Sequence, residues 1–494
     1  MKNISATIVC LLISIFATAQ VCDCLISEVE MNTVNFCNYT IGTVVTVNNE
    51  TEFVNAVNQA NNNGGNMTIL IADGTYQIAS TSWYPYITAS NVVFRSLSGN
   101  RDAVILTGSG MADVSSTGTE VVIYAVGDNI TIADLTIKDV GNHGIAVTGD
   151  NLYVYNVKIQ NTYEQMIKGN SSGNGINNGK VKCSLFEYTN GIGPQWYIGG
   201  LDIHTGTNWT VSDNVFKNIS SPSFSHAEHA IHFWDSSADN LIERNEILNC
   251  DRGIGFGLGS SPNSGGVIKN NMITNDGTGL FHDVGIGIET SPNTKIYNNT
   301  IHVEYQNAIE YRFASTTNVE ISNNLTNKLI KSRNGGSATL ATNIENAVSS
   351  WFVDLTTGDL HLVSNISVAV DMGTTLTGVT KDIDKVARPQ FSSFDIGACE
   401  YLNPLSTVNF DDPKNKTIAY PSPSSTQITI NSILNENSTL TIYNAYGQKT
   451  GVFTNVNLKN GFIIDVNNWA EGIYYCNIIY SDKYNETIKM VVSK

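Results

Sequence analysis

Residues 226–252, HAEHAIHFWDSSADNLIERNEILNCDR, contain two short phrases that recur along residues 129–333. The first phrase places a polar and two small or amide residues between apolar ones, as in TVSDNVF (210–216), LIERNEI (241–247), VIKNNMI (267–273) and KIYNNTI (295–301). Its leading β-branched residue recurs every 22 to 31 residues, at Ile132, Val154, Val181, Val211, Ile242, Ile268, Ile296 and Ile321. This recurrence indicates an internal repeat.

The second phrase, seen in HGIAV, LDIHTG, HAIHFW and VGIGIET, alternates apolar residues at period two, which is typical of short strands that bury one face. A repeat this short cannot close a core alone, so stacked coils must share one. In the later coils one register holds an amide, at Asn214, Asn245, Asn271, Asn299 and Asn324. The pattern predicts an all-β fold, a parallel β-solenoid with an asparagine ladder along its axis.

The first 19 residues carry a lysine, a short apolar run and a small-residue end at Ala17-Thr18-Ala19, which is typical of a cleaved signal peptide. No other segment is apolar enough to span a membrane, so we expect the protein to be exported. We also expect it to be a monomer. The formal net charge of −17 opposes binding to nucleic acid. Cys183 and Cys250 fall within coils and are expected as small buried residues.

Residues 20–43 precede a segment, 44–78, that breaks the repeat pattern. Phe53, Val54, Val57 and Ala60 lie at helical spacing, and Gly64-Gly65 ends the run. We expect one amphipathic helix followed by a strand in TILIADGTYQI, because the first coil of a solenoid needs a cover.

The helix, the DGTYQI strand and the ending FDIGACEY (394–401) resemble right-handed parallel β-helix proteins of the pectin-lyase type. The resemblance covers residues 44–402 and implies a β-helix domain over 44–403. Lyases, glycosidases, epimerases and adhesins share this scaffold, so the resemblance implies the fold and not the reaction.

A polar linker is expected at residues 404–418, followed by short strands in 419–494. YPSPSSTQITI (420–430), IYNAYGQK (442–449) and WAEGIYYCNI (469–478) resemble the C-terminal sorting domain of the type IX secretion system. That resemblance implies a partner in the secretion machinery and a location outside the cell or on its outer surface. The alternative is an ordinary small β-sandwich that binds a ligand.

Outward residues of stacked strands form columns. The buried positions are predicted at Ile145, Ile167, Leu201, Ile231, Ile254, Ile286, Ile309 and Ile330. The residue after each buried position faces outward, and these residues form a first column: Ala146, Lys168, Asp202, His232, Gly255, Gly287, Glu310 and Lys331. The residues two positions further along form a second column: Thr148, Asn170, His204, Trp234, Gly257, Glu289, Arg312 and Arg333. Charged residues therefore flank a glycine floor, which suggests close approach of a ligand or a covering loop.

His226, His229 and His232 are spaced by three, but strand residues three apart face opposite sides, so a three-histidine metal site is not expected. His204, His229, His232 and Arg252 are instead expected to converge from neighbouring coils. Trp234, if exposed, offers a plane for sugar stacking.

This group suits β-elimination from a uronate polysaccharide, which needs a neutralised carboxylate, a base and an acid. The catalytic candidates are Lys168, His204, His229, His232 and Arg252, with Lys168 or a histidine as base. The candidates for binding an acidic polysaccharide are Asp202, Trp234, Glu289, Glu310, Arg312, Lys331 and Arg333.

The Asn-rich coils resemble the chondroitinase B and alginate lyase family, which uses a lysine, an arginine and a calcium ion held by Asn and a Glu-x-Glu pair. These coils have no Glu-x-Glu, so that calcium site does not carry over; Asp202, Glu289 and Glu310 are the carboxylates that could hold Ca²⁺ otherwise. The alternatives are a glycosidase using Glu289 and Glu310, an epimerase, or a non-catalytic adhesin.

Overall fold

The computed structural model describes residues 39–78, 85–111, 121–170, 173, 175–223, 225–280, 282–402, 417–432, 437–480 and 484–494. The predicted signal peptide (1–19), most of segment 20–43 and most of the linker 404–418 lie outside these residues. The chain divides into two compact units, Met1–Leu402 and Asn403–Lys494.

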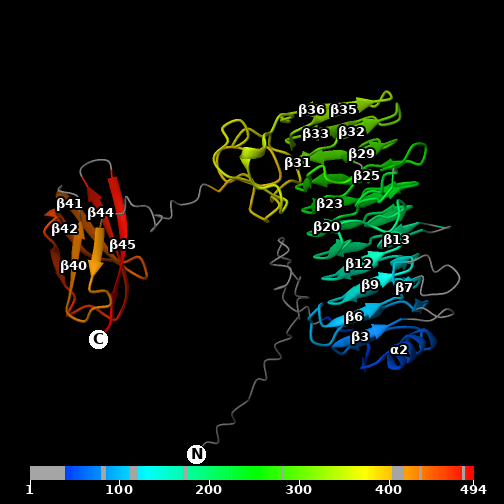
Figure 1. The fold of residues 1–494 in the computed structure, drawn as a ribbon, viewed down its shortest axis with the longest axis horizontal. Helices are drawn as coiled ribbons and strands as arrows, with labels where there is room; N and C mark the ends of the chain where they lie inside the picture. The colour runs from blue at the N-terminus through cyan, green and yellow to red at the C-terminus, as the bar shows by residue number, and fades with distance from the viewer. Residues whose placement is uncertain are drawn as a thin grey trace, which may run out of the picture. The chain divides into compact units, whose positions relative to one another are not determined.

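The first unit is a parallel β-solenoid, with one strand of each coil in each of three long sheets (Figure 1). Sheet A consists of β1 (Thr43–Val47), β2 (Met67–Ile71), β5 (Val92–Ser96), β8 (Ile130–Ala133), β11 (Tyr153–Tyr155), β15 (Lys180–Lys182), β19 (Thr210–Ser212), β23 (Leu241–Glu243), β27 (Val267–Lys269), β30 (Lys295–Tyr297), β33 (Val319–Ser322) and β36 (Ala338–Ala341). Sheet B consists of β3 (Gly74–Gln77), β6 (Val104–Thr107), β9 (Thr136–Val140), β12 (Lys158–Thr162), β16 (Leu185–Glu187), β20 (Val215–Lys217), β24 (Glu246–Leu248), β28 (Met272–Asn275), β31 (Thr300–Val303) and β34 (Leu325–Thr326).

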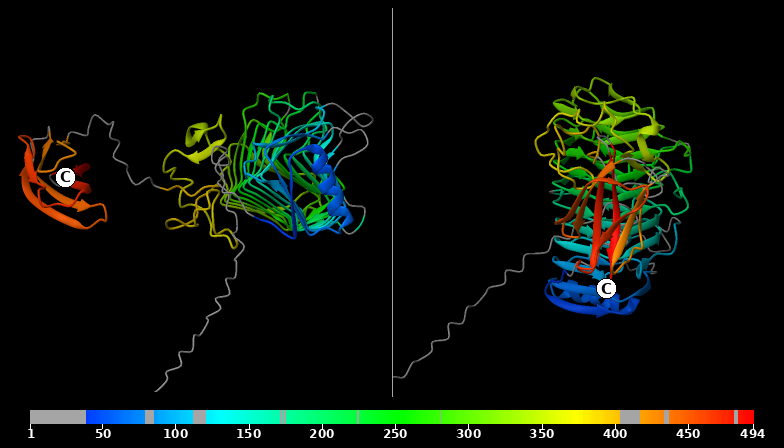
Figure 2. Two further views of the ribbon diagram at one scale, coloured as in Figure 1. Left: turned by 90° about the horizontal axis from the view of Figure 1, so that it is seen from below. Right: turned by 90° about the vertical axis from the view of Figure 1, so that its left-hand side faces the viewer.

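Sheet C consists of β4 (Tyr86–Ile87), β7 (Val121–Ala125), β10 (His143–Val147), β13 (Ile167–Gly169), β17 (Leu201–His204), β21 (Ile231–Trp234), β25 (Ile254–Phe256), β29 (Val284–Glu289), β32 (Asn307–Arg312) and β35 (Leu329–Arg333). A short sheet D extends four of these coils with β14 (Ile176–Asn177), β18 (Gly206–Thr207), β22 (Ser237–Ala238) and β26 (Asn263–Ser264). The outline of the stacked coils is visible end-on in Figure 2.

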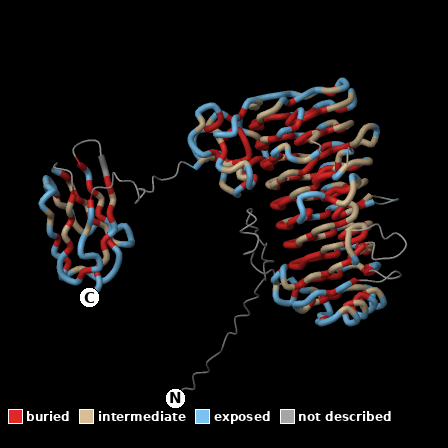
Figure 3. Tube along the Cα trace, in the orientation of Figure 1, coloured by how far each residue is buried: buried red, intermediate tan, exposed pale blue. Residues whose placement is uncertain are grey.

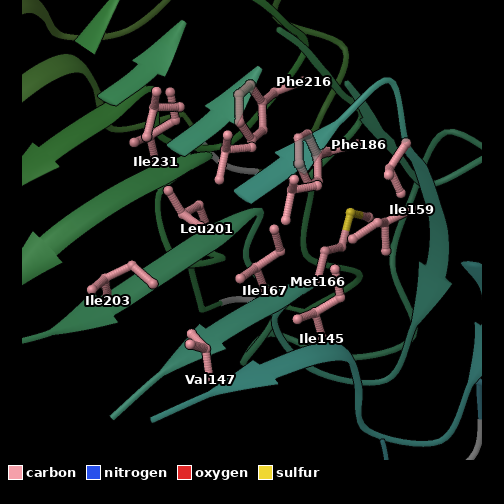
Figure 4. Packing of buried hydrophobic residues seen from close by; sticks show 14 of the residues in the cluster. Ile145, Val147, Ile159, Met166, Ile167, Phe186, Leu201, Ile203, Phe216 and Ile231 are labelled. Carbon is pink, nitrogen blue, oxygen red and sulfur yellow. The ribbon is translucent and has the colours of Figure 1, made fainter. Parts of the chain in front are cut away.

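The registers follow the two recurring phrases. In sheet A, Val211 pairs with Ile242 and Ile242 with Ile268; in sheet C, Leu201 pairs with Ile231 and Ile231 with Ile254. These residues point inward and are fully buried. Figure 3 shows burial repeating along each coil, and Figure 4 shows the sheet C residues in a row facing Phe186 and Phe216, whose rings stack at 4.6 Å. The shared core predicted from the repeat is confirmed.

The asparagine ladder is also confirmed. Side-chain amide Nδ2 to Oδ1 hydrogen bonds of 2.9 to 3.0 Å run from Asn214 to Asn245, Asn271, Asn299, Asn324 and finally Asn343. Each amide also satisfies backbone groups at the bend between sheets A and B, so the ladder fixes the axial register as well as the turn.

Helix α2 (Glu50–Asn62) lies across the open first coil, as Figure 2 shows. Asn49 caps it by accepting a hydrogen bond from Glu52 N at 2.9 Å, while the Glu52 carboxylate accepts one from Asn48 N at 2.8 Å. This resembles a capping box shifted by one residue, because the backbone N–H that Glu52 accepts from belongs to Asn48 rather than to the cap residue Asn49. Phe53, Val57 and Ala60 are buried as predicted, but Ala56 is buried in place of Val54, which is half-buried.

Residues 344–402 lie beside the last coils and include the 3-10 turn η1 (Ser349–Trp351) and the hairpin β37 (Phe352–Asp354) and β38 (Asp359–Leu362). A buried ion pair of 2.6 Å between Arg388 and Glu400 anchors the closing segment. Cys183 is buried as expected but is disulfide-bonded, whereas Cys250 is a free, buried thiol.

The second unit contains two antiparallel sheets that share one core. One sheet holds β39 (Thr417–Tyr420), β40 (Gln427–Ser432) and β43 (Phe462–Asp465). The other holds β41 (Asn437–Asn444), β42 (Lys449–Asn457), β44 (Gly472–Tyr480) and β45 (Tyr484–Val492). The short strands predicted for residues 419–494 are therefore present, and they form a small β-sandwich.

Candidate functional site

The outward face of sheet C carries the predicted column in the expected register. Consecutive Cα pairings run from Lys168 to Asp202, His232, Gly255, Gly287, Glu310 and Lys331. In the neighbouring column, His204 pairs with Trp234, Glu289 pairs with Arg312, and Arg312 pairs with Arg333. Parallel stacking therefore places all these side chains on one surface, about 4.8 Å apart from coil to coil.

Lys168, Asp202, His204 and Trp234 form one group, here called the lysine cluster. The Lys168 ammonium makes an ion pair with Asp202 and lies 3.0 Å from His204 Nε2. The Trp234 indole N–H donates to Asp202 Oδ1 at 2.7 Å. Asp202 is almost fully buried, so its carboxylate is the hub that holds the lysine and the indole in place.

The protonation pattern of the lysine cluster follows from these contacts. Burial lowers the pKa of Lys168, but the charge and hydrogen bond of Asp202 outweigh burial, and the pKa is raised. Asp202 Oδ2 is 3.8 Å from His204 Nε2, which is too long for a hydrogen bond. Because an ammonium can only donate, His204 Nε2 accepts from Lys168 and presents a lone pair. The geometry thus places a protonated lysine beside an unprotonated imidazole nitrogen.

Trp234 does not present the free stacking plane that its position suggested. It is half-buried, with the His204 ring 4.1 Å from its ring centroid and the His232 ring stacked at 5.5 Å and 8°. The indole therefore separates and orients two imidazoles.

The glycine floor is covered by His229. A Cβ added to Gly255 would lie 2.7 Å from the His229 ring, and one added to Gly287 would lie 3.7 Å from His229 Nε2. The imidazole thus occupies the space that the absent side chains leave. Burial holds the pKa of His229 well below its ordinary value, so the ring is neutral.

His232 faces outward, but it is fully buried under its neighbours rather than projecting from the solenoid. Its Nε2 lies 3.2 Å from the Gly257 carbonyl oxygen. His226, the third histidine of the spacing, is not part of the group formed by Glu228, His229 and His232, whose ligand atoms lie within 4.8 Å of one another.

Arg252 lies at the edge of a small polar cavity of ≈ 30 Å³ that His229, Glu289, Glu310 and Arg312 also line. Its guanidinium donates to Asp283 at 2.8 Å. His229 and Arg252 therefore line one cavity, whereas His204 belongs to the lysine cluster.

Each predicted glutamate is held by an arginine. Arg312 makes an ion pair with Glu289, and Arg333 donates to both oxygens of Glu310 at 3.0 and 2.8 Å. Asp202 is three coils from Glu289, about 14 Å along the axis, so the three carboxylates do not form a common calcium cage. Lys331 is exposed at the end of the column.

A larger cavity of ≈ 370 Å³ lies on sheet B against residues 357–361. It is lined by apolar residues of β20, β24 and β28 together with the charged or polar side chains of Lys217, Glu246, Asp359 and His361. The cavity on the predicted face is smaller than this one.

Reasoning from strand columns missed three neighbours of these groups. Glu228 and Asp283 lie just before β21 and β29, and Asp235 follows β21, with an oxygen 3.5 Å from His204 Nδ1. The signal was present in the sequence, since Glu228 and Asp235 adjoin His229 and Trp234, but period-two analysis ignores residues at the bends. The Trp196-Tyr197 loop reaches the same face, because Lys168 Nζ lies 5.9 Å from the Tyr197 ring centroid.

Two family models match the chain. A right-handed β-helix region matches residues 199–347, and a secretion-system C-terminal sorting domain matches residues 418–493. No curated protein sequence matches.

The solved structures that are similar to the chain match it at low identity and low TM-score. An alginate lyase from Paenibacillus sp. str. FPU-7 is 10% identical, with a TM-score of 0.37 over 60% of this chain and 99% of that one. PfbA, a surface adhesin of Streptococcus pneumoniae, is 12% identical, with a TM-score of 0.34 over 61% and 90%. An endo-xylogalacturonan hydrolase from Aspergillus tubingensis is 13% identical, with a TM-score of 0.30 over 66% and 88%.

No helix of the described residues is both long and apolar enough to cross a membrane. The stacked parallel coils agree with the β-helix match, and the antiparallel second unit coincides with the sorting-domain match. The chain is therefore a right-handed parallel β-helix protein with a type IX secretion sorting domain, and it is secreted or displayed at the cell surface.

Proposed function

We propose that this secreted β-helix is a polysaccharide lyase that cleaves a uronate-containing chain by β-elimination on the outer face of sheet C. The observation that supports this most is the contact of 3.0 Å between the Lys168 ammonium and His204 Nε2. Elimination needs a cation near the uronate carboxylate and a base near its α carbon, and this pair supplies both in adjacent coils.

In this mechanism, the Lys168 ammonium turns from His204 Nε2 to the uronate carboxylate and stabilises the charge that develops there, and the freed lone pair of Nε2 takes the proton at C5. The electron pair of the C5–H bond forms the C4=C5 double bond, the C4–O bond breaks, and the departing oxygen takes up the proton that His204 received. No water is consumed and no redox change occurs. Asp235, 3.5 Å from His204 Nδ1, orients the imidazole, and Asp202 holds Lys168 in place.

The raised pKa of Lys168 favours the role of charged partner and opposes the role of base that its residue type also allowed. Arg252 lines the neighbouring polar cavity, and its proposed role is to bind a second acidic sugar. An inverting glycosidase needs two carboxyl groups that are free to act on the substrate and its water, whereas Glu289 and Glu310 are each held in an ion pair with an arginine.

The test is incubation of the secreted protein with alginate, pectate and chondroitin sulphate while ultraviolet absorbance is followed. Only elimination leaves a conjugated double bond in the product. Lys168→Gln and His204→Asn are each expected to lower kcat by about 10²–10⁴-fold.

The matched control is Lys158→Gln, which removes a similarly shielded lysine, ion-paired to Asp102, from sheet B. It should leave turnover unchanged. New reducing ends without absorbance would instead indicate a hydrolase, and the absence of both signals on these and further uronate polymers would favour an adhesin.

A further inference from the structure

Three side chains with metal-binding atoms converge where the chain enters β21. One ligand atom each from Glu228, His229 and His232 lies within 4.8 Å of the other two. The His232 Nδ1 to Glu228 Oε2 distance is 3.6 Å. Ligand atoms of a tetrahedral zinc site, with bonds of about 2.0–2.2 Å, are about 3.4 Å apart. The three groups therefore need only a small contraction to surround one ion.

Each of the three side chains also has one buried polar atom that lacks a hydrogen-bond partner in the described part of the chain. Glu228 Oε2, His229 Nδ1 and His232 Nδ1 are buried there without a hydrogen-bond partner. The His229 residue is 7% exposed and His232 0%. An unpaired buried polar atom costs about 1–3 kcal/mol, so three in one place are hard to explain by packing alone. A bound cation would satisfy all of them.

The tautomer of His232 supports the same conclusion. The Gly257 carbonyl oxygen can only accept, so His232 Nε2, 3.2 Å away, carries the proton and Nδ1 presents a lone pair. Metal-binding histidines commonly donate their other N–H to a backbone carbonyl in this way.

We propose that Glu228, His229 and His232 bind a divalent transition-metal ion of the zinc class. Two imidazoles and one carboxylate suit zinc and its neighbours, whereas calcium prefers an all-oxygen cage. Three protein ligands leave one coordination position for water or for an oxygen of a bound ligand. Asp202 Oδ1 lies 3.7 Å from His232 Nδ1 but is engaged by Trp234, so it is a neighbour of the site rather than a ligand.

The site differs from both metal arrangements considered for the sequence. It uses two of the three spaced histidines and replaces His226 with Glu228. It also does not involve Glu289 or Glu310, because each of these carboxylates makes an ion pair with an arginine. Its formation is independent of the proposed elimination reaction, because ion binding needs no polysaccharide.

The test uses the full secreted chain, freed of metal with a chelator. Titration with Zn²⁺ in a calorimeter should give one site per chain, and Co²⁺ should give the intense visible absorption of a four-coordinate site. Glu228→Gln, which keeps the size of a side chain that is 15% exposed, should weaken Zn²⁺ binding at least about tenfold. His232→Gln should weaken it further.

The matched control is His361→Gln. His361 also lies between two carboxylates, with Nδ1 2.6 Å from Asp359 and Nε2 2.8 Å from Asp384, but it is far from β21 in the fold. This variant should bind Zn²⁺ as the parent does. No saturable binding, or binding that survives Glu228→Gln and His232→Gln but is lost in His361→Gln, would overturn the proposal.

Discussion

Replacing Asn245 by leucine should destabilise the β-helix far more than a surface substitution does. Asn245 is fully buried. Its Nδ2 donates to Asn271 Oδ1 at 2.9 Å, to Val211 O at 2.9 Å and to Glu243 O at 3.2 Å. Its Oδ1 accepts from Asn214 N at 3.2 Å and from Asn214 Nδ2 at 3.0 Å.

Leucine has nearly the same size but makes none of these five bonds. At a net value of about 1 kcal/mol for each bond, with extra cost where a buried partner stays unpaired, we expect a loss of about 3–5 kcal/mol in the free energy of unfolding. Asn245→Asp keeps the acceptor but turns the donor into an oxygen that faces other oxygens, so it should be similarly harmful.

The assay is urea unfolding followed by tryptophan fluorescence, since Trp209 is buried in the β-helix. Asn58→Leu, on the exposed side of α2, is the control and should change the free energy of unfolding by less than about 0.5 kcal/mol. If Asn245→Leu were no worse than Asn58→Leu, the ladder would not be a source of stability and the reasoning would be wrong.

Three further outcomes are expected. Gly255→Ala should displace the His229 ring, because the new Cβ would lie 2.7 Å from it, and should lower the free energy of unfolding by about 1–3 kcal/mol. Gly287→Ala should lower it less in the same assay, because its new Cβ has its nearest contact at 3.1 Å, with Val284 Cγ1. Burial lowers the pKa of His361, but hydrogen bonds to Asp359 and Asp384 outweigh burial and raise the pKa to about 11. The protonated His361 should therefore stabilise the fold fully below about pH 6.5, the pKa in the unfolded chain, and progressively less as the pH rises toward 11. Melting temperatures of the parent and His361→Gln should therefore differ at pH 6 and approach each other at pH 10; a constant difference would contradict this. Deleting residues 403–494 should keep the protein inside the producing cell with its β-helix folded, as judged by fractionation and circular dichroism, and an unfolded product would show that the second unit is needed for folding.

The sequence was sufficient for the repeat, the registers and the ladder, because each depends on backbone period and spacing alone. The column from Lys168 through Asp202, His232 and Gly255 follows from period-two alternation once one buried position in each coil is identified. The helix that covers the first coil could also be predicted from the sequence, because one face of residues 50–62 is apolar.

Contacts between side chains could not be obtained in this way. Bends of unequal length decide how Glu228 and His229 enter β21, so a column count does not reveal that His229 lies over Gly255. Ion pairing of Glu289 with Arg312 depends on side-chain rotamers in adjacent coils, although their neighbouring positions were known. Trp234 was placed correctly, but its burial between His204 and His232 is a property of three side chains together.

The buried charge on sheet C is itself an argument for function. Asp202 and Glu310 are 1% and 3% exposed, and each depends on a cation from an adjacent coil. Such pairs are often replaced by apolar residues without loss of stability, because the cost of removing both charges from water offsets their attraction. The inward positions of the same strands, such as Leu201 and Ile309, show that the fold needs only aliphatic residues to be stable. An outward face that holds buried lysine, aspartate and imidazole contacts is therefore better explained by selection for chemistry than by selection for stability, and on this chain that face is sheet C between β13 and β32.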